Sequence, residues 1–182
     1  MSRVRSIPRI GHVLTIAALA ALGACAEQKP TEPPAPAPLE ATSSPSATLV
    51  ECPTDETLSA TVPIGPEGGT VALGGTSVLF PAGVLEPNTL VTLTIPASKY
   101  VEIAIRTNGA NEFSYDVNLQ PVITIDYSRC RRSDVLVKPL TAWYIDSNTK
   151  TPRYQMEGAV DNKLLKTVTF PTQHFSGYAI AF

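Results

Sequence analysis

The sequence has few charges, no long apolar run and no sustained helical period. Charged residues make up 16% of the 182 positions, and the formal net charge is −2. A chain of this kind lacks the basic surface of an electrostatic nucleic-acid binder, so we expect no nucleic-acid partner. The apolar segment Val13–Leu22 is far shorter than the roughly 20 residues with which a helix spans a bilayer. No window of a dozen residues repeats apolar side chains at helical spacing, which argues against a mainly helical fold.

The first 25 residues have the features of a bacterial export signal. Arg3, Arg5 and Arg9 form a basic region, which the apolar segment follows. Leu22-Gly23-Ala24-Cys25 comes next and resembles the lipobox of bacterial lipoproteins, in which signal peptidase cuts before the cysteine and the cysteine is lipidated. We therefore predict a lipoprotein signal peptide over residues 1–24 and a lipid anchor on Cys25, because several acyl chains on one cysteine anchor a protein stably. An ordinary secretory signal is the alternative.

Residues 25–51 are predicted to form a disordered, proline-rich tether. Prolines are frequent there, at Pro30, Pro33, Pro34, Pro36, Pro38 and Pro45. The segment has no aromatic residue and buries too little apolar surface to fold. Fully extended, it reaches on the order of 80 Å, enough to hold a domain away from a membrane. A cleaved pro-segment is the alternative.

Residues 52–182 are predicted to fold as one antiparallel β-sandwich. Apolar runs recur along this region, at Val71–Leu73, Val78–Phe80, Val91–Ile95, Val101–Ile105, Ile123–Tyr127, Trp143–Ile145, Leu165–Phe170 and Phe175–Phe182. Turn signals separate them, at Asn108-Gly109, Asn118–Pro121, Asp146–Asn148 and Asp161-Asn162. Short runs at spacings near ten residues, punctuated by Gly, Pro and Asn, are typical of an all-β sandwich.

The cysteines predict one disulfide. If Cys25 carries lipid, Cys52 and Cys130 remain as an even pair in an exported domain. Exported proteins fold in an oxidising compartment, so we expect these two cysteines to be joined. Two buried free thiols are the alternative.

Histidine is too scarce for most metal or hydrolase sites. His12 would be lost with residues 1–24, which leaves His174 alone. Zinc sites and serine or cysteine hydrolases combine histidine with further ligands or partners. We therefore expect no metal, no cofactor and no conventional hydrolase activity.

Two loops invite comparison with ligand sites. The Gly65–Gly69 loop lacks the Gly-Lys-Ser/Thr of a P-loop and is predicted to be a turn between strands. Near Asn108, Asn111 and Glu112, a plain hairpin loop is expected, with an oxygen-ligand calcium site as the alternative.

Three arginines surround Cys130. Arg129, Arg131 and Arg132 are candidates for binding an anionic partner, such as lipid headgroups or a cell-wall polymer. The favoured interpretation is a solvated turn in which Asp134 lies nearby.

Three stretches carry a family resemblance. They are Ile64–Val71 (IGPEGGTV), Val78–Leu85 (VLFPAGVL) and His174–Tyr178 (HFSGY). They resemble the ZU-5 domain, which occurs in zonula occludens scaffolds, Unc-five netrin receptors, ankyrins, death-domain proteins and secreted bacterial proteins. The resemblance covers about Ser59–Phe182 and implies a β-sandwich that makes protein–protein contacts without a small-molecule cofactor.

The resemblance also implies a candidate self-cleavage site at His174, Phe175 and Ser176. In some relatives of the death-domain class, His-Phe-Ser marks cleavage between Phe and Ser. The Ser176 hydroxyl would attack the Phe175 carbonyl, and His174 is the available base. The structural alternative is a last strand that packs Tyr178, Ile180 and Phe182 inward, with a β-bulge at Gly177 that buries Phe175, and we expect this alternative.

The sequence therefore predicts a membrane-anchored, non-enzymatic lipoprotein of the bacterial cell envelope. Ala26 after Cys25 favours the outer membrane, by the sorting rule that the lipobox resemblance brings with it. The partners expected are the membrane, through the lipid on Cys25, and an envelope or extracellular protein or glycan. The alternative is a self-processing protein that is cleaved once between Phe175 and Ser176.

Overall fold

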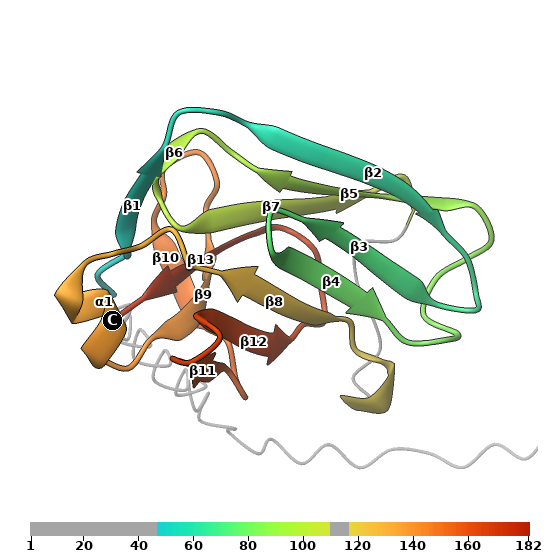
Figure 1. Cartoon of the computed structure of the whole chain (residues 1–182). Coiled ribbons are helices and arrows are strands. Elements are labelled where there is room, and N and C mark those ends of the chain that lie inside the picture. Colours follow the sequence, from blue (N-terminus) through green and yellow to red (C-terminus); the bar gives the residue numbers. More distant parts are fainter. Residues whose placement is uncertain (1–46, 110–116) are drawn as a thin grey trace, which may run out of the picture. The chain divides into compact units, whose positions relative to one another are not determined.

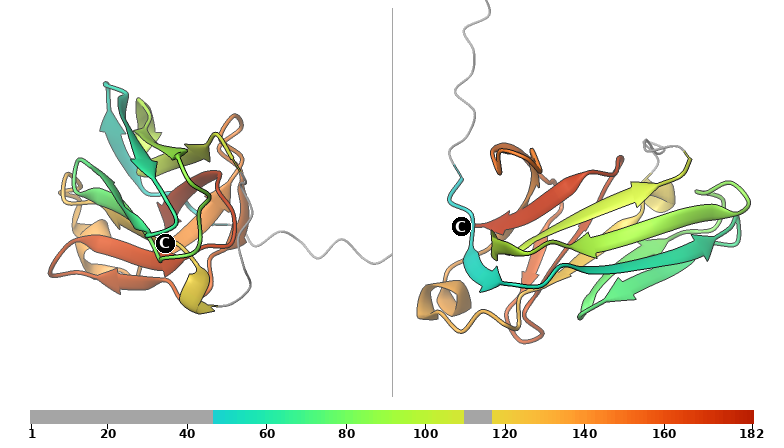
Figure 2. Two further views of the ribbon diagram at one scale, coloured as in Figure 1. Left: turned by 90° about the vertical axis from the view of Figure 1, so that its right-hand side faces the viewer. Right: turned by 90° about the horizontal axis from the view of Figure 1, so that it is seen from above.

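The computed structural model describes residues 47–109 and 117–182, which form a β-sandwich (Figures 1 and 2). Its strands are β1 (Glu51–Thr54), β2 (Leu58–Ile64), β3 (Gly69–Leu73), β4 (Thr76–Phe80), β5 (Thr89–Ile95), β6 (Ser98–Tyr100), β7 (Glu102–Thr107), β8 (Val122–Asp126), β9 (Thr141–Ile145), β10 (Pro152–Gln155), β11 (Val160–Asn162), β12 (Thr167–Pro171) and β13 (Gly177–Ala181). One 3₁₀ turn, η1 (Val117–Leu119), precedes β8, and one short helix, α1 (Ser133–Val137), follows it.

The strands form three antiparallel sheets. One has six strands in the order β10-β9-β13-β7-β5-β2, another has five in the order β11-β12-β8-β4-β3, and β1 pairs with β6 alone. The two large sheets lie face to face in both views of Figure 2. The predicted all-β antiparallel sandwich is confirmed.

The main core lies between the two large sheets. In β5, Val91, Leu93 and Ile95 are buried while the residues between them are more exposed. On the opposite sheet, Ile123 and Ile125 of β8 alternate in the same way. This period of two is the pattern by which the sequence predicted the strands, because successive side chains point to opposite faces of a sheet.

Strand β13 lies in the middle of the six-stranded sheet and is buried on both faces. Tyr178 and Ile180 belong to the main core. Ala179 and Ala181 belong to a second, smaller cluster with Leu49 and other residues. Small residues on that outer face let Leu49 pack directly on the strand.

The folded domain begins earlier than the predicted boundary at Cys52. Leu49 is 8% exposed and Val50 is fully buried. The Val50 nitrogen donates to the Ile180 carbonyl at 2.9 Å, and Leu49 forms a bridge with Ala181. Residues 47–51 were assigned to the tether from their composition. Thr48, Leu49 and Val50 instead pair with the C-terminal part of β13 and the residue after it. The prediction failed because the apolar residues Ala47, Leu49 and Val50 form too short a run, beside a polar, proline-rich segment, to indicate a strand.

The predicted turn at Asp161-Asn162 is also wrong, because both residues belong to β11. The turn lies at residues 163–166, where the Leu165 nitrogen donates to the Asn162 side chain at 3.0 Å. Lys166 has a positive φ of 56° and ends this turn. Strand β12 consequently starts at Thr167 instead of at Leu165.

The β-bulge expected at Gly177 is absent, although Phe175 is buried as predicted. Strand β13 begins at Gly177 and pairs with β7 and β9 in continuous register. Phe175 lies before the strand, is 8% exposed and packs edge-to-face on Phe80 at 5.5 Å between ring centroids. A bend at Ser176 turns the chain between Phe175 and β13, so no extra residue within the strand is needed.

The Gly65–Gly69 loop is a turn between β2 and β3, as predicted. The Gly68 nitrogen donates to the Gly65 carbonyl at 3.1 Å. Gly68 has a φ of 78°, and a Cβ there would lie 2.4 Å from the Phe80 carbonyl oxygen. The loop therefore requires glycine for close backbone packing.

The predictions for residues 1–46, including lipidation of Cys25, lie outside the described residues. No helix in the described part of the chain is long and apolar enough to cross a membrane.

Candidate functional site

Three tyrosines stand side by side across neighbouring strands of the six-stranded sheet. Tyr144 of β9 is directly opposite Tyr154 of β10 and Tyr178 of β13. Residues opposite each other in adjacent strands share a face of the sheet. The rings of Tyr144 and Tyr154 stack at 4.9 Å between centroids, and Tyr178 meets Tyr144 edge-to-face at 6.3 Å. The row leads from the core to the surface, since Tyr178 is fully buried and Tyr154 is 43% exposed.

His174 holds this row in place. Its Nε2 bonds to the Tyr154 hydroxyl, and its Nδ1 lies 3.2 Å from the Tyr178 hydroxyl. Its carbonyl oxygen accepts hydrogen bonds from the Tyr178 hydroxyl and, at 2.8 Å, from the Thr172 hydroxyl. Tyrosine hydroxyls therefore engage both imidazole nitrogens.

Both phenols at the ends of the row stay protonated at neutral pH. Burial raises the pKa of Tyr178 well above its usual range, and the Thr172 hydrogen bond opposes this only in part. Burial, and then the neighbouring Tyr144, raise the pKa of Tyr154. The two ends of the row are thus neutral hydroxyl groups.

A cavity of about 640 Å³ opens beside Tyr154 and His174. Its described walls come from three segments, and they are Gln120, Tyr154, Gln155, Met156, Glu157, Gly158, Pro171, Thr172, Gln173 and His174. The volume falls in the range typical of small-molecule sites. We refer to it as the Tyr154 cavity.

The Tyr154 cavity combines an aromatic ring with side chains that donate and accept hydrogen bonds. Gln120, Gln155 and Gln173 bring carboxamides, each with two N–H donors and one acceptor oxygen. Glu157 brings an acceptor, and none of the described lining residues is Lys or Arg. The described wall thus favours a neutral ligand rich in hydroxyl groups over a phosphate or other anion.

The predicted self-cleavage residues lie next to one another in chain order but not in one hydrogen-bond network. His174 is directed into the tyrosine row, whereas Ser176 lines a second cavity of about 330 Å³ with Arg106 and Ser147. The Ser176 carbonyl accepts from the Ile105 nitrogen at 3.0 Å and so belongs to the sheet. Phe175 packs in the core between them.

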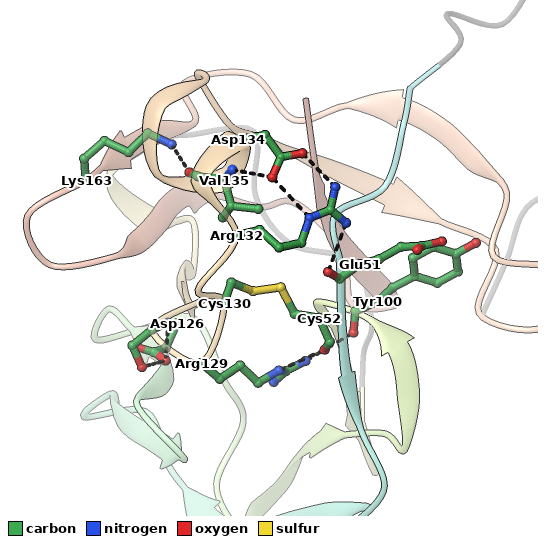
Figure 3. The surroundings of a disulfide bond; sticks show 11 residues. Glu51, Cys52, Tyr100, Asp126, Arg129, Cys130, Arg132, Asp134, Val135 and Lys163 are labelled. Carbon is green, nitrogen blue, oxygen red and sulfur yellow. Dashed lines mark hydrogen bonds and ion pairs between the residues drawn. A yellow bond between two sulfur atoms is a disulfide. The ribbon is translucent and has the colours of Figure 1, made fainter.

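The predicted disulfide is present at one end of the sandwich (Figure 3). Cys52 and Cys130 are bonded, with 5.5 Å between their Cα atoms. Arg129 donates to the backbone carbonyl of Cys52 at 3.2 Å. Arg132 forms an ion pair with Asp134 at 2.7 Å.

The three arginines around Cys130 thus play different parts. Arg129 and Arg132 bind groups of the protein itself, as Figure 3 shows. The favoured interpretation, in which Asp134 lies near the arginines of a turn, therefore holds for Arg132. Arg131 is exposed.

The structure gives no support to the calcium alternative where it describes the chain. The Asn108 side chain accepts from the Leu90 nitrogen at 2.8 Å, which is a hairpin contact. Asn111 and Glu112 lie outside the described residues. Within residues 47–109 and 117–182, no three His, Cys, Asp or Glu side chains gather as metal ligands would.

The sequence prediction found His174 but missed its aromatic partners and the glutamines. The available signal was the turn at Asp146–Asn148, since a hairpin there brings Tyr154 opposite Tyr144. The contribution of Gln120 had no signal in the sequence, because it depends on the packing of a distant segment.

No protein-family model, curated protein or solved structure matches this chain. The resemblance to the ZU-5 domain therefore stays a prediction, and the functional argument depends on the site itself.

Proposed function

We propose that this chain is a lipid-anchored, non-enzymatic protein of the bacterial cell envelope, whose β-sandwich binds a saccharide in the Tyr154 cavity. The observation that carries the proposal is an exposed aromatic ring fixed at the edge of a cavity with an amide-rich wall. Tyr154 is stacked on Tyr144 and bonded to His174, so its ring is already ordered before a ligand arrives. Such preorganisation lowers the entropy cost of binding.

A saccharide fits this wall better than the other expected partner, a protein surface. Sugar hydroxyls both donate and accept hydrogen bonds, as do the carboxamides of Gln155 and Gln173. The C–H face of a sugar ring packs on an aromatic ring, for which Tyr154 is available. A protein partner would engage a flatter surface than a cavity of about 640 Å³.

The anchor is proposed from the sequence of the first 25 residues, and the disulfide is consistent with it. A Cys52–Cys130 bond is what an oxidising compartment outside the cytoplasm would produce. Location in the outer membrane, which Ala26 after Cys25 favours, is part of the same proposal.

Self-cleavage is the less favoured function. A serine hydroxyl needs a base, and both nitrogens of His174 are engaged by tyrosine hydroxyls. We expect denaturing mass spectrometry of the purified protein to show an unbroken Phe175–Ser176 bond, unchanged in Ser176→Ala. A dominant fragment ending at Phe175, lost in Ser176→Ala, would establish the self-processing function instead.

Ligand binding is tested with polysaccharides and with soluble fragments of envelope glycans. We expect saturable binding by calorimetry, and a loss of about tenfold or more in affinity for Tyr154→Ala, because an aromatic anchor in a pocket carries much of the binding energy. Tyr100→Ala is the matched control, since Tyr100 is also partly exposed but lies near the disulfide (Figure 3). Binding that both variants retain would exclude the Tyr154 cavity as the site.

The anchor is tested separately with Cys25→Ser. We expect the wild-type protein to carry acyl chains by mass spectrometry and to float with membranes in a density gradient, and the variant to lose both properties. A variant that is processed normally and released as soluble protein would contradict lipid anchoring.

A further inference from the structure

Exposed apolar side chains gather at one end of the sandwich. Leu136 and Val137 of α1 are 38% and 76% exposed, and Leu164 and Leu165 of the β11–β12 turn are 91% and 64% exposed. Val160 of β11 is 64% exposed. These five account for more than half of the large apolar side chains that stand exposed in the described residues. Grouped exposure of this kind marks an interaction surface.

Hydrogen bonds join the two elements that carry these side chains. Lys163, in the β11–β12 turn, donates to the Val135 carbonyl of α1 at 2.8 Å (Figure 3). Asp161 accepts from the Leu140 nitrogen just after α1 at 2.9 Å. We call this surface, formed by residues 126–140, which include α1, and residues 160–166, the α1 end.

The α1 end is basic in a chain that is otherwise acidic. Residues 126–140 and 160–166 contain six basic residues, Arg129, Arg131, Arg132, Lys138, Lys163 and Lys166, and three acidic residues, Asp126, Asp134 and Asp161. Their net charge is therefore +3, whereas the whole chain carries −2. Apolar side chains among basic ones are the composition by which proteins bind anionic lipid surfaces.

The chain enters the sandwich beside this same end. Leu49 pairs with Ala181, next to Phe182, whose ring lies 5.0 Å below the Lys138 ammonium. Arg132 contacts the Glu51 carbonyl, and Figure 1 places α1 and the C-terminal end of the chain together. The 21 residues between Cys25 and Ala47 span at most about 75 Å. A lipid on Cys25 therefore has its point of attachment to the domain at the α1 end.

We propose that the α1 end docks on the anionic bilayer to which the chain is anchored, with Leu164 and Leu165 entering the headgroup region. The proposal builds on the lipid anchor in the proposed function, and it leaves the Tyr154 cavity out of the contact. Arg131 and Lys138 are exposed, Lys166 is partly exposed, and these cations of the α1 end complement lipid phosphates. The anchor then keeps the bilayer at high effective concentration, so weak docking suffices.

Depth-dependent fluorescence quenching tests the docking without relying on lipidation in the cell. The chain from Cys25 to Phe182 is coupled through the Cys25 thiol to maleimide lipids in vesicles of phosphatidylcholine and phosphatidylglycerol that contain brominated lipids. Leu164→Trp is compared with Leu90→Trp, which replaces an exposed leucine on β5. The single native tryptophan, Trp143, is buried and gives a constant background. We expect quenching of Leu164→Trp to exceed that of Leu90→Trp about threefold.

Charge reversal supplies the second comparison. Lys138→Glu should reduce the quenching of Leu164→Trp on anionic vesicles, whereas Arg106→Glu, the same reversal of charge at an exposed position of β7, should not. Equal quenching of the two introduced tryptophans would overturn the proposal. A dimer would also overturn the proposal, because a second copy would then cover the surface. It would be seen if the uncoupled Leu164→Trp chain sedimented as a dimer and its introduced tryptophan were shielded from solvent before vesicles are added. Absence of acyl chains on the cellular protein would refute only the anchor, since the coupled vesicles supply it.

Discussion

At the scale of single residues, Glu102 is the one Asp, Glu, Lys or Arg that is buried among the described residues. Its side chain is 2% exposed and pairs with Lys150 at 2.7 Å through Oε2. Among the described residues, its Oε1 is the one buried side-chain oxygen or nitrogen without a hydrogen-bond partner. A buried carboxylate that loses its partner is strongly destabilising.

We therefore predict that Lys150→Met lowers the free energy of unfolding by about 3 kcal/mol, as measured by urea denaturation. Adding Glu102→Gln should recover much of this loss, because the buried charge is then removed. Lys99→Met breaks an ion pair with Glu51 in which both side chains are about half exposed, and its effect on the free energy of unfolding should be far smaller than that of Lys150→Met, because exposed ion pairs contribute little. Equal losses in the two lysine variants would show that burial of Glu102 has no special weight.

At the scale of elements, the β9–β10 hairpin positions Tyr154, the tyrosine of the proposed binding site. Asp146 closes its turn by accepting from the nitrogens of Asn148 and Thr149, each at 3.0 Å, and from Arg153 at 2.8 Å. The backbone N–H of Thr149, followed by Arg153, holds the pKa of Asp146 well below its usual range. The turn thereby fixes the register that places Tyr154 opposite Tyr144.

We predict that Asp146→Ala weakens saccharide binding several-fold without unfolding the core, since the hairpin loses its turn contacts. In the wild type, the pKa of Asp146 is lower in the folded than in the unfolded chain, so its carboxylate stabilises the hairpin at pH values above the unfolded pKa of about 3.9. This contribution fades as the pH falls below about 4. Protection factors from amide hydrogen exchange of residues 146–155 should be lower at pH 3 than at pH 6 in the wild type, and this difference should be absent in Asp146→Ala. Asp55→Ala, in the exposed β1–β2 turn, is the control and should behave like the wild type. Equal protection factors at both pH values in the wild type would contradict the role of Asp146.

Element by element, strands with one buried face were predictable from sequence, and mostly exposed or very short elements were not. Strands β5 and β8 alternate apolar and polar residues, because one of their faces is buried. Strand β10 (Pro152–Gln155) is mostly exposed at the edge of its sheet, and its residues have no apolar alternation to detect. Helix α1 has five residues, too few for a helical period.

The candidate site was predictable only in part for the same reason. His174 was singled out as the sole histidine of the domain, yet its role depends on Tyr154 and Tyr178. Those three residues meet because the sheet order places β9 between β10 and β13. Pairing order is a property of the whole fold, so residue types and spacing along the chain do not reveal it.

At the scale of the whole molecule, the disulfide closes a loop across most of the domain. Cys52 and Cys130 are separated by 78 positions. In the chain-entropy model, a loop of this length restricts the unfolded chain by up to about 4.5 kcal/mol, and measured effects are often smaller.

We predict that replacing both Cys52 and Cys130 by Ala lowers the free energy of unfolding by about 2–4 kcal/mol in urea denaturation of the non-lipidated chain. Cys25→Ala is the matched control and should leave the stability unchanged, because Cys25 precedes the folded domain. A double variant as stable as the wild type would show that the loop constraint is offset elsewhere.

The position of β13 has a consequence for synthesis and for the proposed export. This strand joins β7 to β9 at the centre of the six-stranded sheet, yet it is the last strand in chain order. While a chain is delivered N-terminus first, β2, β5 and β7 form one group and β9 and β10 another, with no strand between them. The sheet cannot close until residues 177–181 are released. During the proposed export, the sheet would therefore stay incomplete until its last strand has crossed the membrane.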